Sequence, residues 1–287
     1  MQRALPNDTA FAAAPARSAP LDNLKWLITD SFTIIRRNLT QIRRVPEKLL
    51  DVTIQPIMFV VLFGFVFGGA INVPDNISYR SFLMAGIFTQ SIAFLAVGTA
   101  VGMTEDMKTG VMDRFRSLPI SRAAVLFGRT FSDLIQSTLG ATVLGITGAV
   151  VGWRIHEGAL SALAGFGVLL LFGFAMSWIG ILLGLVVKTT EGAQGVGFMA
   201  IFPLTFASNA FVPTDSMPKY LRIFAEWNPI SATTAALRNL FGNSGPGLES
   251  GAWPMRHPVE ASIMWSIALL IVFVPLAIWR YRQTVSQ

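Results

Sequence analysis

The chain contains no cysteine and few charged residues, and both absences limit what kind of protein it is. Without cysteine it forms no disulfide, no thiolate nucleophile and no cysteine metal site. Only 13% of its 287 residues are charged, whereas a soluble domain usually has about a quarter. The two histidines, His156 and His257, lie far apart in the sequence, which argues against a buried zinc centre.

Motifs for nucleotide binding and hydrolysis are also missing. The sequence has no G-x-x-x-x-G-K-[ST] loop to hold ATP phosphates, no G-x-S-x-G nucleophile and no H-E-x-x-H metal helix. No internal repeat of the kind found in many secondary transporters is visible. We therefore expect a chain that is not an enzyme by itself and that holds no cofactor or metal of its own.

Long apolar runs make up most of the sequence. A bilayer core of about 30 Å is crossed by about 20 helical residues, and only helices satisfy every backbone group of such a segment within lipid. The sequence predicts an all-α integral membrane protein with six transmembrane helices, at 52–70, 81–103, 134–152, 159–187, 193–211 and 261–279.

The basic residues are sorted between the connections. Sixteen of the 22 Lys and Arg residues fall on the side of the N-terminus, if six spans are assumed. Positive residues favour the cytoplasmic side, so both termini are expected in the cytoplasm, at a bacterial-type plasma (inner) membrane. The net charge of +6 is explained by this sorting, and nucleic acid is not expected as a partner.

The segment before the first span divides into two parts. Residues 1–22 have no apolar core of a signal peptide, and they are expected to be a disordered cytoplasmic tail. Residues 23–46 have apolar residues at helical spacing beside basic ones, which predicts an amphipathic helix in the membrane interface, ended by Pro46. Packing of this helix on a soluble partner is an alternative. Residues 47–287 then form the six-span domain.

The connection after the second span, 104–122, is predicted to be a short amphipathic helix on the cytoplasmic side. Its apolar stripe is Met107, Val111, Met112, Phe115 and Leu118. Such a helix can dock into a groove on another protein, with charged rim contacts that set its register, from Glu105, Asp106, Arg114 and Arg116. An ordinary interfacial loop is the alternative.

The longest connection, 212–259, follows the fifth span on the outer side. Its prolines divide it into short amphipathic helices that are expected to lie at the outer face or to re-enter the membrane. The most specific motif of the chain begins just before it and continues into it, with Asn209, Phe211, Pro213, Met217, Pro218, Leu221, Asn228 and Pro229.

Both connections resemble one known family. The first connection resembles the cytoplasmic coupling region of ABC-2-type exporter permeases. It has an acidic residue, then a glycine, then Arg-Ser-Leu-Pro-Ile-Ser-Arg before a span. The matching residues are Glu105, Gly110, Arg116, Leu118, Pro119 and Arg122. The motif around Asn209 and Asn228 resembles the C-terminal signature of the daunorubicin-resistance type of drug and lipid exporter.

The resemblance implies a mechanism and partners. The chain would be the transmembrane permease subunit of an ATP-driven exporter that moves amphipathic drugs or lipid-like molecules out of the cytoplasm or inner leaflet. Two copies of a separate ABC ATPase subunit would dock on 104–122 and bind ATP and Mg, and a second permease protomer would complete a homo- or heterodimer. An ion-gradient-driven secondary transporter and a non-transporting membrane sensor subunit remain alternatives.

Some residues inside the spans are candidates for a transport path. Polar groups within apolar helices usually face protein or water, and large apolar side chains can line a route for an amphipathic cargo. The candidates are Gln55, Gln90, Phe202, Phe206 and Asn209. Hydrogen bonding between helices explains the polar residues equally well, and phenylalanines often face lipid or core.

Overall fold

A computed structural model of the chain describes residues 54–55, 57–66, 73, 77–109, 122–245 and 251–286. Within these ranges every regular element is a helix, as predicted. The predicted tail 1–22 and interfacial helix 23–46 lie outside the described residues, as does most of the coupling segment 104–122.

Four helices are long and apolar enough to cross a membrane: α3 (Tyr79–Lys108), α5 (Arg122–Val151), α6 (Gly158–Val186) and α11 (Pro258–Ser286). They correspond to the predicted second, third, fourth and sixth spans. Each has 29 or 30 residues, and a helix of this length extends about 45 Å. Each therefore exceeds the thickness of the hydrocarbon core.

Three of these helices are longer than predicted, and α11 exceeds the predicted limits of 261–279 at both ends. The third span was predicted from residue 134, but α5 begins at Arg122, and α3 continues past residue 103 to Lys108. Both extensions carry charged residues, which is why an apolar run omits them. Arg129 on α5 forms ion pairs with Asp106 and Asp133, and these pairs let the charged turns continue as packed helix.

The fifth predicted span is shorter in the structure, and only part of the first is described. The fifth, α7 (Thr190–Phe206), has 17 residues and contains Pro203. It ends before residue 211, the predicted limit. The described part of the first is an apolar helix, Ile57–Val66, which includes the π-helical turn η1 (Leu62–Val66). The count of six spans therefore stays a prediction, and four are supported by length and composition.

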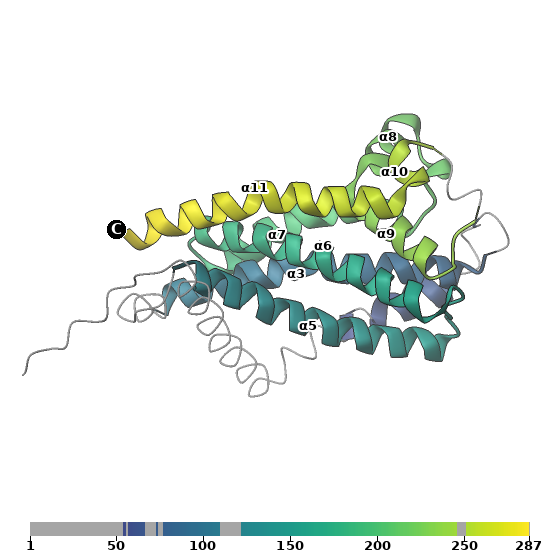
Figure 1. Ribbon diagram of the computed structural model, residues 1–287, viewed down its shortest axis with the longest axis horizontal. Helices are drawn as coiled ribbons and strands as arrows, with labels where there is room; N and C mark the ends of the chain where they lie inside the picture. Colours follow the sequence, from purple (N-terminus) through teal and green to yellow (C-terminus); the bar gives the residue numbers. More distant parts are fainter. Residues whose placement is uncertain are drawn as a thin grey trace, which may run out of the picture.

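Short helices connect α7 to α11: η3 (Thr214–Ser216), α8 (Lys219–Trp227), α9 (Pro229–Leu240) and α10 (Trp253–Arg256). They gather at one end of the bundle, while α11 runs from them to the opposite end (Figure 1). We call these the α8 end and the Lys108 end, after α8 and the last residue of α3. These short helices lie within 212–259, the connection in which the sequence predicts short amphipathic helices.

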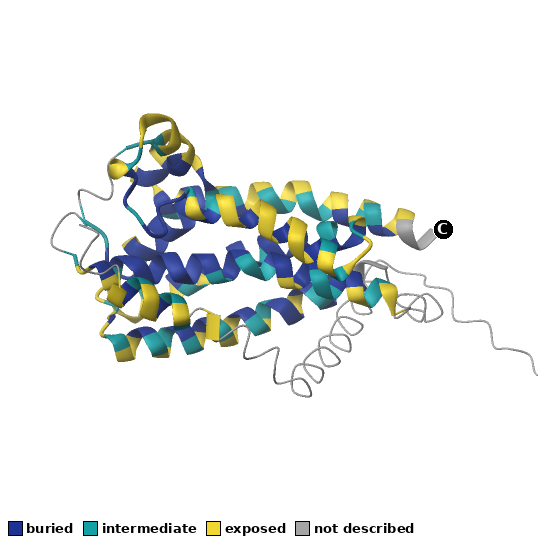
Figure 2. Cartoon of the chain, turned by 180° about the vertical axis from the view of Figure 1, so that it is seen from behind, coloured by how far each residue is buried: buried dark blue, intermediate teal, exposed yellow. Residues whose placement is uncertain are grey.

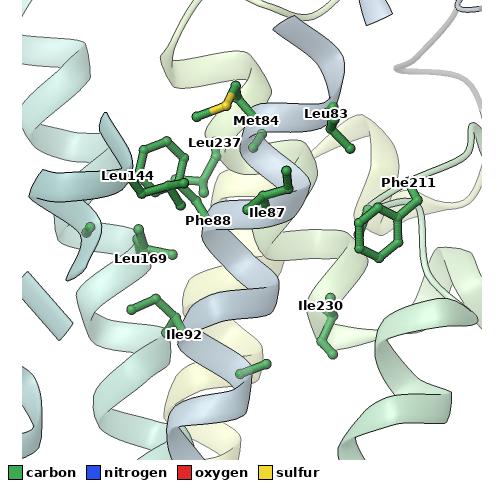
Figure 3. Packing of buried hydrophobic residues seen from close by; sticks show 14 of the residues in the cluster. Leu83, Met84, Ile87, Phe88, Ile92, Leu144, Leu169, Phe211, Ile230 and Leu237 are labelled. Carbon is green, nitrogen blue, oxygen red and sulfur yellow. The ribbon is translucent and has the colours of Figure 1, made fainter. Parts of the chain in front are cut away.

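The helices α3 and α6 form the centre of the bundle, and they approach closely along small residues. A Cβ on Gly180 would overlap the carbonyl oxygen of Ala96, and one on Gly184 would lie 2.5 Å from the carbonyl oxygen of Ala100. Figure 3 shows the apolar core around α3, where Ile87 and Phe88 point to different neighbouring helices.

Large apolar side chains also cover the outside of the bundle. Exposed faces run along α5, α7 and α11 (Figure 2), and they include Val150, Met199 and Ile271. Large contiguous apolar patches are uncommon on soluble monomers, and many of the exposed side chains on these helices are large and apolar. Such a surface suits helices whose outer faces meet lipid or a second subunit.

Candidate functional site

The signature residues Asn228 and Pro229 form the junction between α8 and α9. The side-chain oxygen of Asn228 accepts a hydrogen bond from the N–H of Ile230 at 2.9 Å, which caps α9, and Pro229 occupies the first turn, where no N–H is needed. The Asn228 amide donates to the carbonyl oxygens of Leu204 and Ala207, at 2.7 and 3.1 Å. This one side chain therefore joins α9 to the end of α7.

Asn209, which was predicted for both the signature and the transport path, is buried in the turn after α7. Its backbone N–H donates to Ser231 Oγ at 2.9 Å, and its side-chain amide lies 3.5 Å from the sulfur of Met255. Asn209 thus connects the end of α7 to α9 and α10. Its side-chain oxygen has no hydrogen-bond partner within the described ranges.

The remaining signature residues shape the turn that leads to α8. Pro213 precedes η3, Met217 follows it, and Pro218 precedes the first residue of α8. Pro213 is buried, whereas Pro218 and Leu221 are exposed. Pro213 and Pro218 restrict the backbone before and after a short 3-10 turn. The length of this turn accounts for the spacing of the two prolines in the motif.

A chain of ionic contacts stabilises α8. Arg222 contacts Asp215 and Glu226, each at 2.7 Å, and its hydrogen bond with Glu226 raises the pKa of Arg222. The other carboxylate oxygen of Glu226 accepts a hydrogen bond from the N–H of Ala252 at 3.1 Å. These contacts attach α8 to η3 on one side and to the start of α10 on the other.

Arg238 on α9 is a buried cation that the sequence analysis did not single out. Its side chain is 2% exposed and donates to the carbonyl oxygens of Phe82, Asn209 and Ala210, at 3.1, 2.8 and 3.3 Å. Its guanidinium carbon lies 3.5 Å from the centre of the Phe82 ring. Burial lowers the pKa of Arg238 to about 9.

This environment gives Arg238 a clear structural role. The guanidinium joins α9, α3 and the turn at 209–210, so it holds the α8 end together through backbone acceptors. A predicted amphipathic helix with a lone arginine usually exposes that arginine, and the sequence carried no signal of burial. Arg238 follows a run of small or β-branched residues on α9, 230–236, which permits close packing.

Phe202, Phe206 and Phe211 stack into one series with two rings of the first span. The neighbouring ring centres are 4.3 Å apart for Phe202–Phe206, 5.2 Å for Phe206–Phe211 and 4.8 Å for Phe211–Phe63. Phe59 follows at 5.6 Å from Phe63. The planes of neighbouring rings differ by no more than 29°, so the rings lie nearly parallel.

This phenylalanine series is accessible at its α7 end. Phe202 and Phe206 are 49% and 42% exposed, whereas Phe211 is buried. The core rings behave differently, because Phe88, Trp153 and Phe241 meet at large angles and are buried. The structure therefore brings two path candidates together with one signature residue, on a face where Phe202 and Phe206 are not covered by the described residues.

The two glutamine candidates lie in contrasting places. Gln55 is exposed, four residues before Phe59, a spacing that places both on one side of a helix. Gln90 is 3% exposed within α3, and its side-chain nitrogen has no partner among the described residues. Gln90 is therefore not explained by an observed hydrogen bond between helices. Whether either residue lines a path stays a prediction.

Only the ends of the predicted docking segment are described. Glu105 and Asp106 belong to the last turn of α3; Glu105 is exposed, and Asp106 binds Arg129 at 2.9 Å. Arg122 begins α5, but its side chain lies outside the described residues. The other docking candidates are also outside them, namely Gly110, Arg114, Arg116, Leu118 and Pro119.

The family of the chain follows from its sequence as a whole. A family model described as "ABC-2 type transporter" matches residues 29–241, from before the first span to the end of α9. The chain belongs to the ABC-2 type transporter family. The identification that its coupling and signature motifs suggested is confirmed.

Curated relatives of this ABC-2 chain have names that refer to drug resistance. It is 29% identical over 255 residues to the daunorubicin resistance ABC transporter permease protein DrrB1 of Streptomyces coeruleorubidus, over 89% of this chain and 87% of that one. It is 25% identical to the probable doxorubicin resistance permease DrrC of Mycobacterium tuberculosis, over 92% and 93%. A putative transport permease, ycf38 of Cyanophora paradoxa, is 26% identical over 86% of both chains.

These findings define what the site is. The chain is a multi-pass membrane protein of a transport permease family, whose members generally do not catalyse a reaction. Within the described ranges no group of His, Asp and Glu is arranged to hold a metal ion. Three features therefore bear on function. They are the junction of α7, α8 and α9 at the signature residues, the phenylalanine series, and the ends of the predicted docking segment.

Proposed function

We propose that this chain is the transmembrane permease subunit of an ATP-driven ABC exporter that moves amphipathic drugs or lipid-like molecules outward. The observation that carries the proposal is the family match over 29–241, together with the drug-resistance names of relatives that align over most of their length. The half-exposed phenylalanine series supports an apolar cargo. The Lys108 end would face the cytoplasm, with both termini on that side of the inner membrane.

The energy source in this proposal is a separate subunit. Since the sequence has no Walker loop, ATP and Mg would be bound by two copies of an ABC ATPase. A second permease protomer, identical or related, would complete the pathway. The transmission point would be 104–122, which joins α3 to α5 at the Lys108 end.

The docking segment gives the first prediction. The double variant Glu105→Ala and Arg116→Ala should lose rim contacts with the ATPase, so that ATP-driven transport in vesicles falls at least about tenfold while membrane insertion is unchanged. The matched control is Arg154→Ala with Glu157→Ala, an exposed Arg and Glu at the opposite end. Normal transport by the first pair would refute the docking assignment.

The phenylalanine series gives the second prediction. Replacing Phe206 with Leu removes the ring between Phe202 and Phe211, and one stacked pair is worth about 0.5–1.5 kcal/mol. The apparent dissociation constant for an aromatic drug should therefore rise roughly 2- to 13-fold, measured by drug fluorescence in lipid nanodiscs. Phe198→Leu on the same helix is the control, because that ring lies tilted against Phe94. Equal effects of the two variants would remove the series from the path.

Two other functions make different demands on the protein. A secondary transporter driven by an ion gradient needs a titratable group within the membrane, and the buried Asp133 is one, although Arg129 binds it at 3.5 Å. Collapse of the proton gradient at constant ATP would abolish transport in that case. A non-transporting sensor subunit would bind an ATPase or drug and move no cargo.

The decisive experiment co-expresses the chain with an ABC ATPase encoded beside its gene and purifies the complex into lipid. Stable co-purification, with hydrolysis that drugs stimulate and vanadate inhibits, is the expected result. Failure of the ATPase to bind, with drug flux that follows an ion gradient, would replace the exporter proposal by the secondary transporter. Binding and hydrolysis without flux would favour the sensor.

A further inference from the structure

Arg129 on α5 bridges two carboxylates from different parts of the chain. Its guanidinium lies 2.9 Å from a carboxylate oxygen of Asp106 on α3 and 3.5 Å from one of Asp133, a turn later on α5. Thr99 on α3 donates to the other oxygen of Asp133 at 2.7 Å. Each of the two helices therefore supplies two of the four polar groups, and we call this set the Arg129 bridge.

The Arg129 bridge is shielded from water. Thr99 and Asp133 are buried, and the side chains of Arg129 and Asp106 are only 19% and 15% exposed. Ion pairs on an open surface contribute little to stability, but a shielded charge depends strongly on its partner, because a lone charge there is costly. The contacts therefore hold α3 and α5 in one relative position.

The position of the bridge links it to the docking segment. Asp106 lies two residues before the end of α3, and Arg129 lies just past the second turn of α5. The bridge therefore lies close to both points where the 104–122 connection, which would receive the ATPase, joins a helix. The same end of α3 is attached to α6, since Thr104 donates to the carbonyl oxygen of Gly184 at 3.2 Å.

The bridge adds a polar connection to the apolar contacts that α5 makes at this end. Val125 and Leu126 are buried there in one cluster with Met103 of α3 and with Trp178 of α6. At the α8 end the two helices have apolar contacts, where Met84 lies against Gly148. At the Lys108 end, the charged bridge provides a directional connection between α5 and the centre of the bundle.

Gly102 leaves space for the bridge. A Cβ added to Gly102 would overlap the tip of the Arg129 guanidinium, whereas a Cβ on Gly98, one turn earlier on α3, would meet nothing within 4 Å. The two glycines share one side of α3, yet only one of them is required to be small. This pair provides a test that leaves all four bridging groups in the chain.

We propose that the Arg129 bridge makes the adjoining ends of α3 and α5 move as one unit, so that a displacement of the docking segment reaches both helices. Arg129, Asp106, Asp133 and Thr99 are then positioning residues for the coupling of ATP hydrolysis to transport. The inference rests on the proposed exporter function. A break in the bridge would let the docking segment move while α5 stays behind.

The first test measures cargo moved per ATP hydrolysed by the complete complex in lipid vesicles. Arg129→Gln and Gly102→Ala should each lower this ratio at least about fivefold, the lower end of a typical coupling between sites. ATPase binding and basal hydrolysis should be retained. Gly98→Ala should leave the ratio unchanged, and Arg129→Lys, which keeps the charge, should lie between wild type and Arg129→Gln. Equal ratios in wild type and Arg129→Gln would overturn the inference.

A second measurement does not require the ATPase. Because the chain has no cysteine, spin labels can be placed at two exposed positions, Lys108 on α3 and Phe131 on α5. The distance distribution between them should be narrow in wild type and in Gly98→Ala, and broader in Arg129→Gln and Gly102→Ala. An unchanged distribution in both bridge variants would overturn the inference. Absence of ATP-driven transport by wild type itself would instead show that the exporter function fails.

Discussion

Replacing Arg238 with Met is expected to lower the free energy of unfolding by about 3 kcal/mol. The guanidinium donates to three backbone carbonyl groups from two separate segments. The carbonyl groups of Asn209 and Ala210 lie in a turn after α7, where no helical N–H replaces the lost donor. Methionine fills much of the space, but it provides no donor, so these buried acceptors would remain unpaired.

The sign of this effect depends on two opposing terms. Burial of a cation is costly, and it lowers the pKa of Arg238 to about 9, so the side chain remains charged at neutral pH. Removal of the charge relieves that cost, as replacement of some buried ion pairs by apolar residues shows. Here, however, the partners are fixed backbone carbonyls that stay in place after the substitution, and the contact with the Phe82 ring is lost as well. Destabilisation is therefore expected.

The measurement is equilibrium unfolding in mixed detergent, followed by the fluorescence of the seven tryptophans. Arg256→Met is the matched control, because Arg256 is exposed on α10 at the same end, and surface substitutions usually stay within about 0.5 kcal/mol. Arg238→Lys keeps the charge but not the planar set of donors, so it should fall between. Equal stability of Arg238→Met and wild type would show that Arg238 does not hold the α8 end together.

The parts of the fold that depend on long apolar runs could be predicted from the sequence. The helices α3, α5, α6 and α11 follow predicted spans because a run of this length has few alternatives to a membrane helix. The short helices α8 and α9 could also be predicted, since Pro218 directly precedes α8 and Pro229 begins α9. Local rules of this kind need no knowledge of distant contacts.

The limits of the helices and the burial of polar residues could not be predicted in the same way. The start of α5 depends on ion pairs of Arg129, one of them with Asp106, 23 residues away. The burial of Arg238 depends on Phe82, 156 residues away. Such pairings are decided by tertiary packing, which a single sequence does not display.

The signature motif shows how far a pattern can be interpreted. Its residues lie before and between short helices in the structure, but the pattern did not indicate what each side chain does. In the structure, Asn228 caps one helix and binds the end of another, and Phe211 continues a series of stacked rings. A structural role therefore explains Asn228, while Phe211 also contacts the exposed rings of the proposed path.

Replacing Gly86 with Ala is expected to destabilise the protein by roughly 3 kcal/mol, the upper part of the range for overpacked cores. A Cβ at this position in α3 would overlap the carbonyl group of Ala210. Because the obstacle is backbone and not the end of a flexible side chain, either α3 or the turn at 209–210 must shift. That turn also carries two of the acceptors of Arg238, so the shift would weaken those hydrogen bonds too.

Gly98→Ala on the same helix separates this steric effect from helix propensity. Gly98 has open space around its Cβ position, so alanine there should stabilise the helix by up to about 1 kcal/mol. The same unfolding measurement compares the two variants, and similar changes would show that α3 and the turn can separate without cost. The double variant of Gly86→Ala and Arg238→Met should lose less stability than the sum of the single losses, because both act on the Asn209–Ala210 carbonyls. Additive losses would mean that the close approach and the buried arginine act independently, and the α8 end would then not be one cooperative junction.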